Sequence, residues 1–177
     1  ILAVVLKLPP LRWLLEPEGK DCTMRLKDRI AIVTGGGSGL GAGIARRFAE
    51  EGASLVLADI NGNNAETVAS ETSEGQSKAI AVDMDVTDYD AAEALVAQTV
   101  EEYGTVDILV NSAGTSKHMS FLDAKPAEFQ YIMKVNLEGT MYCGQHAARV
   151  MAAKGYGRIV NIASISGERA GVGRTGY

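Results

Sequence analysis

The chain has 177 residues, of which 46% are hydrophobic and 22% are charged, and these values predict one globular domain with a substantial core. Its net charge is −5 and it has no cluster of Lys and Arg residues, so we expect no nucleic-acid partner. The two cysteines, Cys22 and Cys143, make no disulfide framework, and their number favours a protein of the reducing cytoplasm.

The N-terminal segment differs in composition from the rest of the chain. It begins with a short apolar run, Ile1 to Leu8, which two prolines end. The run is shorter than the about 20 residues that cross a bilayer, and it lacks the basic start and cleavage site of a secretory signal, so we expect no membrane partner. We interpret residues 1–23 as an extension outside the domain, which comprises residues 24–177. The extension is either upstream sequence translated ahead of a natural start at Met24 or a genuine disordered segment.

Beyond Met24, short apolar runs alternate with longer amphipathic stretches, a pattern typical of βαβ units and a parallel sheet. Strands are expected at residues 29–33, 54–59, 78–83, 106–110 and 157–163. Helices are expected at residues 40–51 and 63–73, after a cap at Thr87 or Asp88, and from Pro126 to about Lys154 with a break near Asn136. Right-handed crossovers place the first strand at the centre of a doubly wound parallel sheet with the nominal order 3-2-1-4-5-6. The predicted fold class is therefore α/β of the Rossmann type, incomplete at the C-terminus because the sixth strand is not in the sequence.

A glycine-rich segment, Thr34-Gly-Gly-Gly-Ser-Gly-Leu-Gly41, lies between the first strand and the first helix. Glycines at this place let the backbone approach a dinucleotide pyrophosphate, and the helix N-terminus offers unpaired N–H groups to the phosphate charge. The segment from Gly37 to Ala42 fits the pattern Gly-x-Gly-x-x-Ala, and no Gly-Lys-Ser/Thr follows to make a P-loop. We therefore predict a dinucleotide site at this loop.

The second strand ends in an acidic residue, Asp59, 18 residues beyond Gly41. A dinucleotide-binding fold places an acidic residue about 20 residues after its loop, where the carboxylate accepts a hydrogen bond from the ribose 2′-OH. The same carboxylate repels a 2′-phosphate, so the predicted cofactor is NAD in preference to NADP. The alternative is that Asp59 merely caps the next turn.

Three further motifs stand at strand ends: Asp85-Val86, Asn111-Ser-Ala-Gly114 and Asn161-Ile-Ala-Ser164. Together with the glycine loop they resemble the motifs of the short-chain dehydrogenase/reductase family, and the resemblance covers the chain from Met24 to its end. Ser112 is a mild departure, because the family usually has a second asparagine there. The resemblance implies that the adenine ring lies beside the Asp85-Val86 pair.

The resemblance also defines the expected cofactor site. In the family's phosphate loop the residue before the second glycine is usually basic in NADP-preferring members, and here it is Ser38, which again favours NAD. The cofactor-binding residues that the resemblance implies are Gly35, Gly37, Ser38, Gly39, Leu40, Gly41, Asp59, Ile60, Asp85, Val86, Asn111, Ala113 and Gly114.

The same resemblance implies three catalytic residues, Asn136, Ser164 and Tyr177. Tyr177 stands 13 residues after Ser164, which is the family spacing, and the family lysine four residues further on would lie beyond the last residue printed. In such a site the tyrosine exchanges a proton with the substrate oxygen, the serine hydrogen-bonds that oxygen, and the asparagine breaks its helix and holds a relay water. The alternatives are that Ser164 satisfies backbone groups, with Ser166 as a competitor for its role, and that Asn136 and Tyr177 are structural.

The resemblance thus implies an oxidoreductase that transfers hydride between NAD and a secondary alcohol or ketone, such as a sugar, a polyol or a 3-oxoacyl compound. Its partners are then a small-molecule substrate and, for the whole protein, further copies in a dimer or tetramer. The alternative is a nucleotide-binding fragment without catalysis, and the 177-residue chain itself is expected to be inactive because the lysine is not in it. Cys143 and His146 lie one helical turn apart, but no further Cys or His cluster completes a metal site, so none is expected.

Overall fold

The computed structural model describes residues 24–73, 77–169, 173 and 177, so the N-terminal extension lies outside the described residues. The elements in chain order are β1 (Ile30–Thr34), α1 (Gly39–Glu50), β2 (Ser54–Asp59), α2 (Gly62–Thr72), β3 (Ala79–Asp83), α3 (Tyr89–Tyr103), β4 (Ile108–Asn111), α4 (Pro126–Met133), the π-helix η2 (Lys134–Glu138), α5 (Gly139–Lys154), β5 (Arg158–Asn161) and the 3-10 helix η3 (Ile165–Gly167). The predicted alternation of strands and helices is confirmed. Among the described helices, none is long and apolar enough to cross a lipid bilayer.

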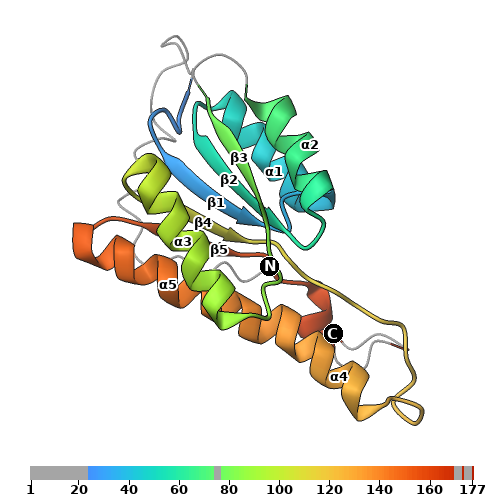
Figure 1. Ribbon diagram of the computed structural model, residues 1–177. Helices are drawn as coiled ribbons and strands as arrows, with labels where there is room; N and C mark the ends of the chain where they lie inside the picture. Colours follow the sequence, from blue (N-terminus) through green and yellow to red (C-terminus); the bar gives the residue numbers. More distant parts are fainter. Residues whose placement is uncertain (1–23, 74–76, 170–172, 174–176) are drawn as a thin grey trace, which may run out of the picture.

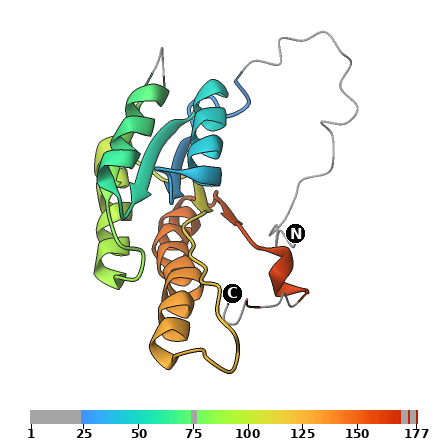
Figure 2. The ribbon, with the colours of Figure 1, turned by 90° about the vertical axis from the view of Figure 1, so that its right-hand side faces the viewer.

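The five strands form one parallel sheet in the order β3-β2-β1-β4-β5. Helices α1 and α2 cover one face of this sheet and α3 and α5 cover the other, as Figures 1 and 2 show. This is the doubly wound Rossmann-type arrangement that the sequence predicts. It brings the carboxyl ends of all five strands to one edge.

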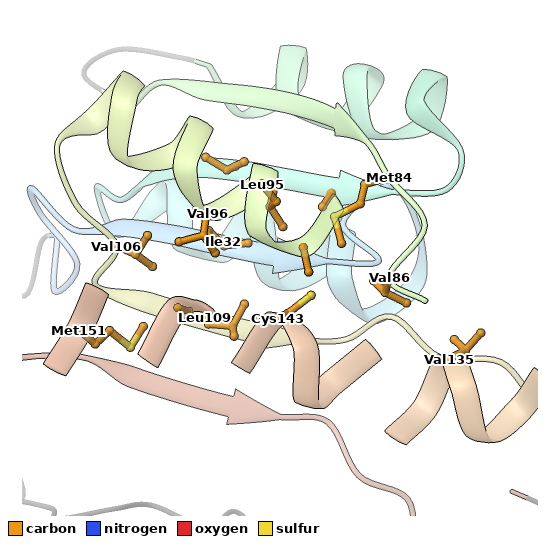
Figure 3. Close-up of a cluster of buried hydrophobic side chains, with 14 residues drawn as sticks. Ile32, Met84, Val86, Leu95, Val96, Val106, Leu109, Val135, Cys143 and Met151 are labelled. Atoms are coloured by element: carbon orange, nitrogen blue, oxygen red, sulfur yellow. The ribbon is translucent and has the colours of Figure 1, made fainter. Parts of the chain in front are cut away.

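Side chains that alternate along the strands fill two cores, one on each face of the sheet. On β1, Ile32 points to α3 and α5, whereas Ala31 and Val33 point to α1 and α2. Figure 3 shows the first of these cores, in which Ile32 and Leu109 from the sheet meet Leu95 from α3. Each fully buried Leu or Ile side chain stabilises the fold by about 1.5–3 kcal/mol. Central strands are buried on both faces, so residues pointing to either side are apolar. This explains the continuous apolar runs in the sequence.

The ends of α3 and α5 carry the residues that capping requires. The Asp88 carboxylate accepts hydrogen bonds from the N–H groups of Asp90 and Ala91 at 2.9 and 3.1 Å, so Asp88 rather than Thr87 is the cap. Helix α3 ends at Gly104 (φ 79°) and α5 at Gly155 (φ 71°). Both glycines adopt the left-handed conformation that stops a helix and turns the chain toward the next strand.

The helical region from Pro126 to Lys154 is interrupted near Asn136, as predicted. Pro126 occupies the first turn of α4, and η2 separates α4 from α5. Gly139 at the start of α5 packs closely against the chain after β3, since a β-carbon built on it lies 2.8 Å from Val86 Cγ2. Short π-helical turns within α-helices are rare and are frequent at functional sites.

Strand β5 pairs with β4 and with no other described strand. It is shorter than the predicted span 157–163, because only Arg158–Asn161 is in register with Ile108–Asn111 of β4. Val160 in β5 and Ile162 just after it are each 40% exposed. The outer edge of β5 is therefore uncovered in the part of the chain that the structure describes.

An ionic cluster joins the turn before β1 to the C-terminal end of α1. Glu51, which is 4% exposed, accepts hydrogen bonds from the backbone N–H, Nε and Nη2 of Arg25 at 2.9–3.1 Å. The guanidinium of Arg47 also pairs with this carboxylate. These charge-assisted bonds fix the direction in which the chain enters the central strand.

Candidate dinucleotide-binding and active site

The candidate site residues gather at the carboxyl edge of the sheet. The chain leaves β1 for α1 on one face, and it leaves β4 for α4 and α5, of which α5 packs on the opposite face. Open α/β sheets bind their ligands at such a point, where neighbouring strands send the chain to opposite faces. In Figure 1, α4 extends beyond this edge and the C-terminus lies near it.

Two glycines are required by close packing in the loop after β1. Gly35 has a φ of 66°, and a β-carbon built on it lies 2.9 Å from the Cα of Ala113. A β-carbon on Gly41 would lie 2.1 Å from the carbonyl oxygen of Gly35. A side chain fits at neither position without displacing backbone. The glycines therefore bring the first turn of α1 close to the end of β4.

The outer part of the same loop is open. Ser38, Gly39 and Leu40 are exposed, and the Ser38 side chain forms no capping hydrogen bond with the described residues of α1. Gly39 has a φ of 52°, and no described atom lies within 4 Å of a β-carbon built on it. The first N–H groups of a helix lack intrahelical acceptors, so this opening offers donors and the positive end of the helix dipole to an anion. The residues present fit a pyrophosphate.

Asp59 contacts the glycine loop directly. Its Oδ2 accepts a hydrogen bond from the Gly37 N–H at 2.9 Å, and its Oδ1 accepts one from the Asn61 N–H at 2.9 Å. The second bond shows that Asp59 does support the turn before α2, which was the alternative to ribose binding. A carboxylate has about four acceptor positions, so both oxygens can still accept a hydrogen bond from a ribose hydroxyl. Ile60, the next residue, is 64% exposed.

The chain after β3 is packed against α5. The Asp85 carboxylate accepts a hydrogen bond from the Thr87 N–H at 2.9 Å. Val86 is 9% exposed, and its side chain belongs to the core in Figure 3. The side chain of Val86 is thus largely taken up by this core.

Asn111 ends β4 in a buried position, 4% exposed. Its Nδ2 donates hydrogen bonds to Asn161 Oδ1 at 2.9 Å and to the Thr140 carbonyl at 3.3 Å. Its Oδ1 has no hydrogen-bond partner among the described residues. A buried acceptor without a donor is costly, and a hydroxyl or amide of a bound cofactor would satisfy it.

The carboxamide of Asn136 holds the chain that follows β4. Its Oδ1 accepts from the Thr115 N–H and its Nδ2 donates to the Thr115 carbonyl, both at 2.8 Å. A β-carbon on Gly114 would lie 3.5 Å from the same Oδ1. The side chain of Asn136 therefore fixes the loop after β4 against η2.

Ser164 and Tyr177 stand in the last part of the chain. Ser164 precedes η3, and its Oγ accepts a hydrogen bond from the Ser166 N–H at 3.2 Å. This is the backbone role considered from the sequence, but the Ser164 hydroxyl still has its own hydrogen to donate. Tyr177 is 40% exposed. Between residues 169 and 177 the structure describes Gly173, whose carbonyl accepts a hydrogen bond from the Met119 N–H at 2.8 Å.

The pair Cys143 and His146 lies in the interior. Cys143 is fully buried, and burial raises the pKa of its thiol to about 11, so the thiol stays protonated at neutral pH. His146 Nδ1 lies 3.4 Å from Nη1 of Arg149. In the described ranges, no group of three or more His, Cys, Asp and Glu side chains is arranged to hold a metal ion.

Three residues outside the predicted set complete this edge of the sheet. Thr34 Oγ1 accepts hydrogen bonds from the N–H groups of Ser112 and Ala113 at 3.2 Å each. Asn161 Oδ1 accepts a hydrogen bond from the Asn111 side-chain amide. Thr115 donates its backbone N–H to the Asn136 carboxamide and accepts a hydrogen bond from it at the backbone carbonyl. Thr34 and Asn161 stand at strand ends within the motifs, which was a usable signal. Nothing local in the sequence marks Thr115, because its partner is 21 residues away.

The fold and the glycine loop define a Rossmann-type domain. The model of the short chain dehydrogenase family matches residues 29–177, and the chain belongs to this family. The structure is similar to the crystal structure of an NAD+-bound xylitol dehydrogenase, with a TM-score of 0.84 and 29% sequence identity. The match covers 86% of this chain and 59% of the xylitol dehydrogenase chain.

Two curated relatives are named as a synthase and a dehydrogenase. Zerumbone synthase of Zingiber zerumbet is 40% identical over 156 residues, which are 87% of this chain and 58% of the relative. Cis-4-hydroxycyclohexanecarboxylate dehydrogenase of Sinomonas cyclohexanicum is 39% identical over 141 residues, which are 79% of this chain and 56% of the relative. The chain thus spans less than two thirds of the length of these relatives.

Proposed function

We propose that the protein is an NAD-dependent oxidoreductase that moves hydride between its cofactor and a secondary alcohol or ketone. The observation that carries the proposal is the contact of the phosphate loop with Asp59, in which the Gly37 N–H donates to Oδ2 at 2.9 Å. Groups suited to a pyrophosphate and to a ribose thereby lie side by side. Membership of the short chain dehydrogenase family and the NAD+-bound structural relative support the proposal.

The preference for NAD over NADP rests on charge. Asp59 places a carboxylate where the ribose 2′ position is expected, and a 2′-phosphate there would meet like charge. Ser38 at the open N-terminus of α1 offers no cation to such a phosphate. The remaining cofactor contacts in this proposal come from the loop glycines, Leu40, Ile60, the Asp85-Val86 pair and the chain from Asn111 to Gly114.

The proposed chemistry assigns one task to each candidate catalytic residue. When bound, the nicotinamide ring accepts the hydride in oxidation and returns it in reduction. The Tyr177 phenol exchanges a proton with the substrate oxygen, and the Ser164 hydroxyl donates a hydrogen bond to that oxygen as charge develops on it. Asn136 positions the loop after β4 through Thr115 and thereby shapes the site around the reacting carbon.

The proposed substrates are sugars, polyols or 3-oxoacyl compounds. The names of two relatives, a xylitol dehydrogenase and a hydroxycyclohexanecarboxylate dehydrogenase, support a substrate with a secondary hydroxyl. We also propose a homo-oligomer for the whole protein. Phe129, Leu137 and Met141 on the α4–α5 region are 42%, 57% and 53% exposed, which supports burial of this surface by further copies.

The test is a fluorescence titration of the full-length protein with NADH and NADPH, followed by turnover assays on secondary alcohols with NAD. We expect tighter NADH binding, and Asp59→Ala should shift the ratio of the two Kd values toward NADPH by about tenfold, chiefly by removing repulsion. Asp83→Ala is the matched control, because Asp83 lies opposite Asp59 in the register of β2 and β3. Tighter NADPH binding by the unchanged protein would contradict the proposed preference.

A second candidate function is nucleotide binding without catalysis by the 177 residues alone. The exposed edge of β5 favours it, because a catalytic group needs a fixed position and this strand leads to Ser164. We expect the 177-residue chain to bind NADH without measurable turnover. Equal turnover by this chain and the full-length protein would show that these 177 residues suffice for catalysis.

A further inference from the structure

Thr140, in the first turn of α5, contacts two residues of the candidate site at once. Its hydroxyl donates a hydrogen bond to the backbone carbonyl of Asn136 at 3.0 Å. Its own backbone carbonyl accepts a hydrogen bond from the Asn111 side-chain amide at 3.3 Å. The side chain of Thr140 thus contacts the candidate catalytic asparagine, whereas its main chain contacts the buried asparagine at the end of β4.

The hydroxyl bond lies where the regular helical pattern is interrupted. The Gly139 N–H donates to the Lys134 carbonyl, five residues back, which is the spacing of a π-helix. Asn136 is the middle residue of this π-helical stretch. Such turns are rare, and a side-chain hydrogen bond across this one helps to hold the backbone of Asn136 in it.

The backbone of Asn136 in turn sets the direction of its carboxamide. The carboxamide accepts from the Thr115 N–H and donates to the Thr115 carbonyl, both at 2.8 Å. Hydrogen bonds weaken as their angles depart from linearity, so a small rotation of Asn136 weakens both bonds together. The hydroxyl of Thr140 therefore acts on the loop after β4 through Asn136.

A hydroxyl in another helix makes the same kind of bond away from the site. Thr99 Oγ1 donates to the Leu95 carbonyl at 2.7 Å in α3, four residues back, as Thr140 does to Asn136. Bonds of this kind satisfy a hydroxyl within a helix and have no functional meaning by themselves. The bond of Thr140 differs in its acceptor, which belongs to a candidate catalytic residue in η2. Thr99 is therefore an internal control for the loss of such a bond.

We propose that Thr140 is a positioning residue whose hydroxyl holds Asn136 in the orientation that fixes the loop after β4 during turnover. The proposal rests on the oxidoreductase function proposed for the same site. The contact with Asn111 uses the main chain of Thr140, so it survives replacement of the side chain. Loss of the hydroxyl should therefore slow the reaction without weakening cofactor binding.

The experiment compares Thr140→Val, Thr140→Ser and Thr99→Val in the full-length protein. Valine has the shape of threonine without the hydroxyl. Thr140→Val should lower kcat for a secondary alcohol with NAD by about 3- to 10-fold, while the Kd of NADH changes by less than about twofold. Thr140→Ser keeps the hydroxyl and should recover most of kcat. Thr99→Val loses the same kind of bond in α3, so it should lower the thermal midpoint but leave kcat unchanged.

A second measurement does not need activity. The Thr115 amide hydrogen is donated to Asn136, so its exchange with deuterium, followed by NMR, reports on this contact. We expect exchange to be about 3- to 10-fold faster in Thr140→Val and unchanged in Thr99→Val.

Three results would overturn the inference: unchanged Thr115 exchange in Thr140→Val, an unchanged kcat in that variant, or an equal fall in kcat in Thr99→Val. A failure of the proposed function looks different. In that case the unchanged protein oxidises no secondary alcohol, and the exchange rate of Thr115 alone decides whether Thr140 holds Asn136.

Discussion

The glycines of the loop after β1 are needed for different physical reasons, and the structure separates them residue by residue. At Gly41 the obstacle is the backbone, because a β-carbon would lie 2.1 Å from the Gly35 carbonyl oxygen. At Gly37 the obstacle is the neighbouring helix, since a β-carbon would lie 2.8 Å from the Ala65 backbone nitrogen. Gly39 meets no described atom within 4 Å, and its φ of 52° is what favours glycine there.

The substitution Gly41→Ala should lower the free energy of unfolding by about 1–3 kcal/mol, because the loop must move to relieve the overlap. The same movement should weaken NADH binding. Gly43→Ala is the matched control in the same helix: no described atom lies within 4 Å of its β-carbon position, so alanine should stabilise α1 by roughly 0.5–1 kcal/mol. Urea unfolding and NADH titration of both variants measure these effects. A Gly41→Ala protein as stable as the unchanged one would mean that the loop can repack at no cost.

At the scale of elements, the turn before β1 depends on Glu51 at the end of α1. The hydrogen bonds from the Arg25 side chain and backbone, together with the charges of Arg25 and Arg47, lower the pKa of the Glu51 carboxyl from 4.5 to about 2. A carboxyl with a lowered pKa in the folded state stabilises the fold above its unfolded pKa, and this stability is lost as the pH falls toward the folded value. The contribution of Glu51 is therefore complete above about pH 4.5 and disappears between that pH and about 2.

The substitution Glu51→Gln should remove this part of the pH dependence. We expect the variant to be less stable at neutral pH, and its thermal midpoint should fall less than that of the unchanged protein between pH 5 and pH 3. Glu50→Gln is the control, because the Glu50 side chain is 64% exposed and pairs with Arg47 on the surface. Parallel pH profiles for Glu51→Gln and the unchanged protein would show that Arg25 does not act through this carboxylate.

The elements themselves could be predicted from the sequence because their signals are local. Apolar runs mark the strands, Asp88 marks the start of α3, and each boundary predicted from the sequence lies within two residues of the observed one. Among the N-terminal ends of the strands, the start of β4 differs most from its predicted position. Val106 is fully buried and its apolar side chain is typical of a strand, but the pairing with β1 begins at Ile108.

The contacts that assemble the candidate site could not be predicted, because each joins segments that are distant in the sequence. Thr115 and Asn136 are 21 residues apart, and Gly37 and Asp59 are 22 apart. The sequence indicates that these residues lie at the same edge of the sheet. Which donor meets which acceptor depends on how α2 and η2 pack, and this information is not in any local pattern.

At the scale of the whole molecule, the uncovered edge of β5 is the feature most open to self-association. A strand edge presents unpaired backbone N–H and C=O groups, and Val160 and Ile162 add apolar surface beside them. A charged side chain on such an edge opposes pairing with another copy.

For the 177-residue chain, Val160→Lys should therefore raise the protein concentration at which light scattering appears, with a change of less than about 0.5 kcal/mol in the free energy of unfolding. The control is Ile159→Lys on the neighbouring residue, which packs against the core with α3 and α5. Burying that charge should cost roughly 2 kcal/mol or more and should increase scattering. Unchanged scattering in Val160→Lys would place the self-association surface elsewhere, with the α4–α5 surface of Phe129, Leu137 and Met141 as the next to test.

The order of strands in the sheet also bears on how the protein folds while it is being synthesised. β1 emerges from the ribosome first and takes the central position. Every later strand pairs with one already made: β2 with β1, β3 with β2, β4 with β1 and β5 with β4. No strand from β2 to β5 has to wait for a partner that lies further along the chain. The sheet can thus grow outward from its centre at the pace of translation, with only its current edges exposed to other nascent chains.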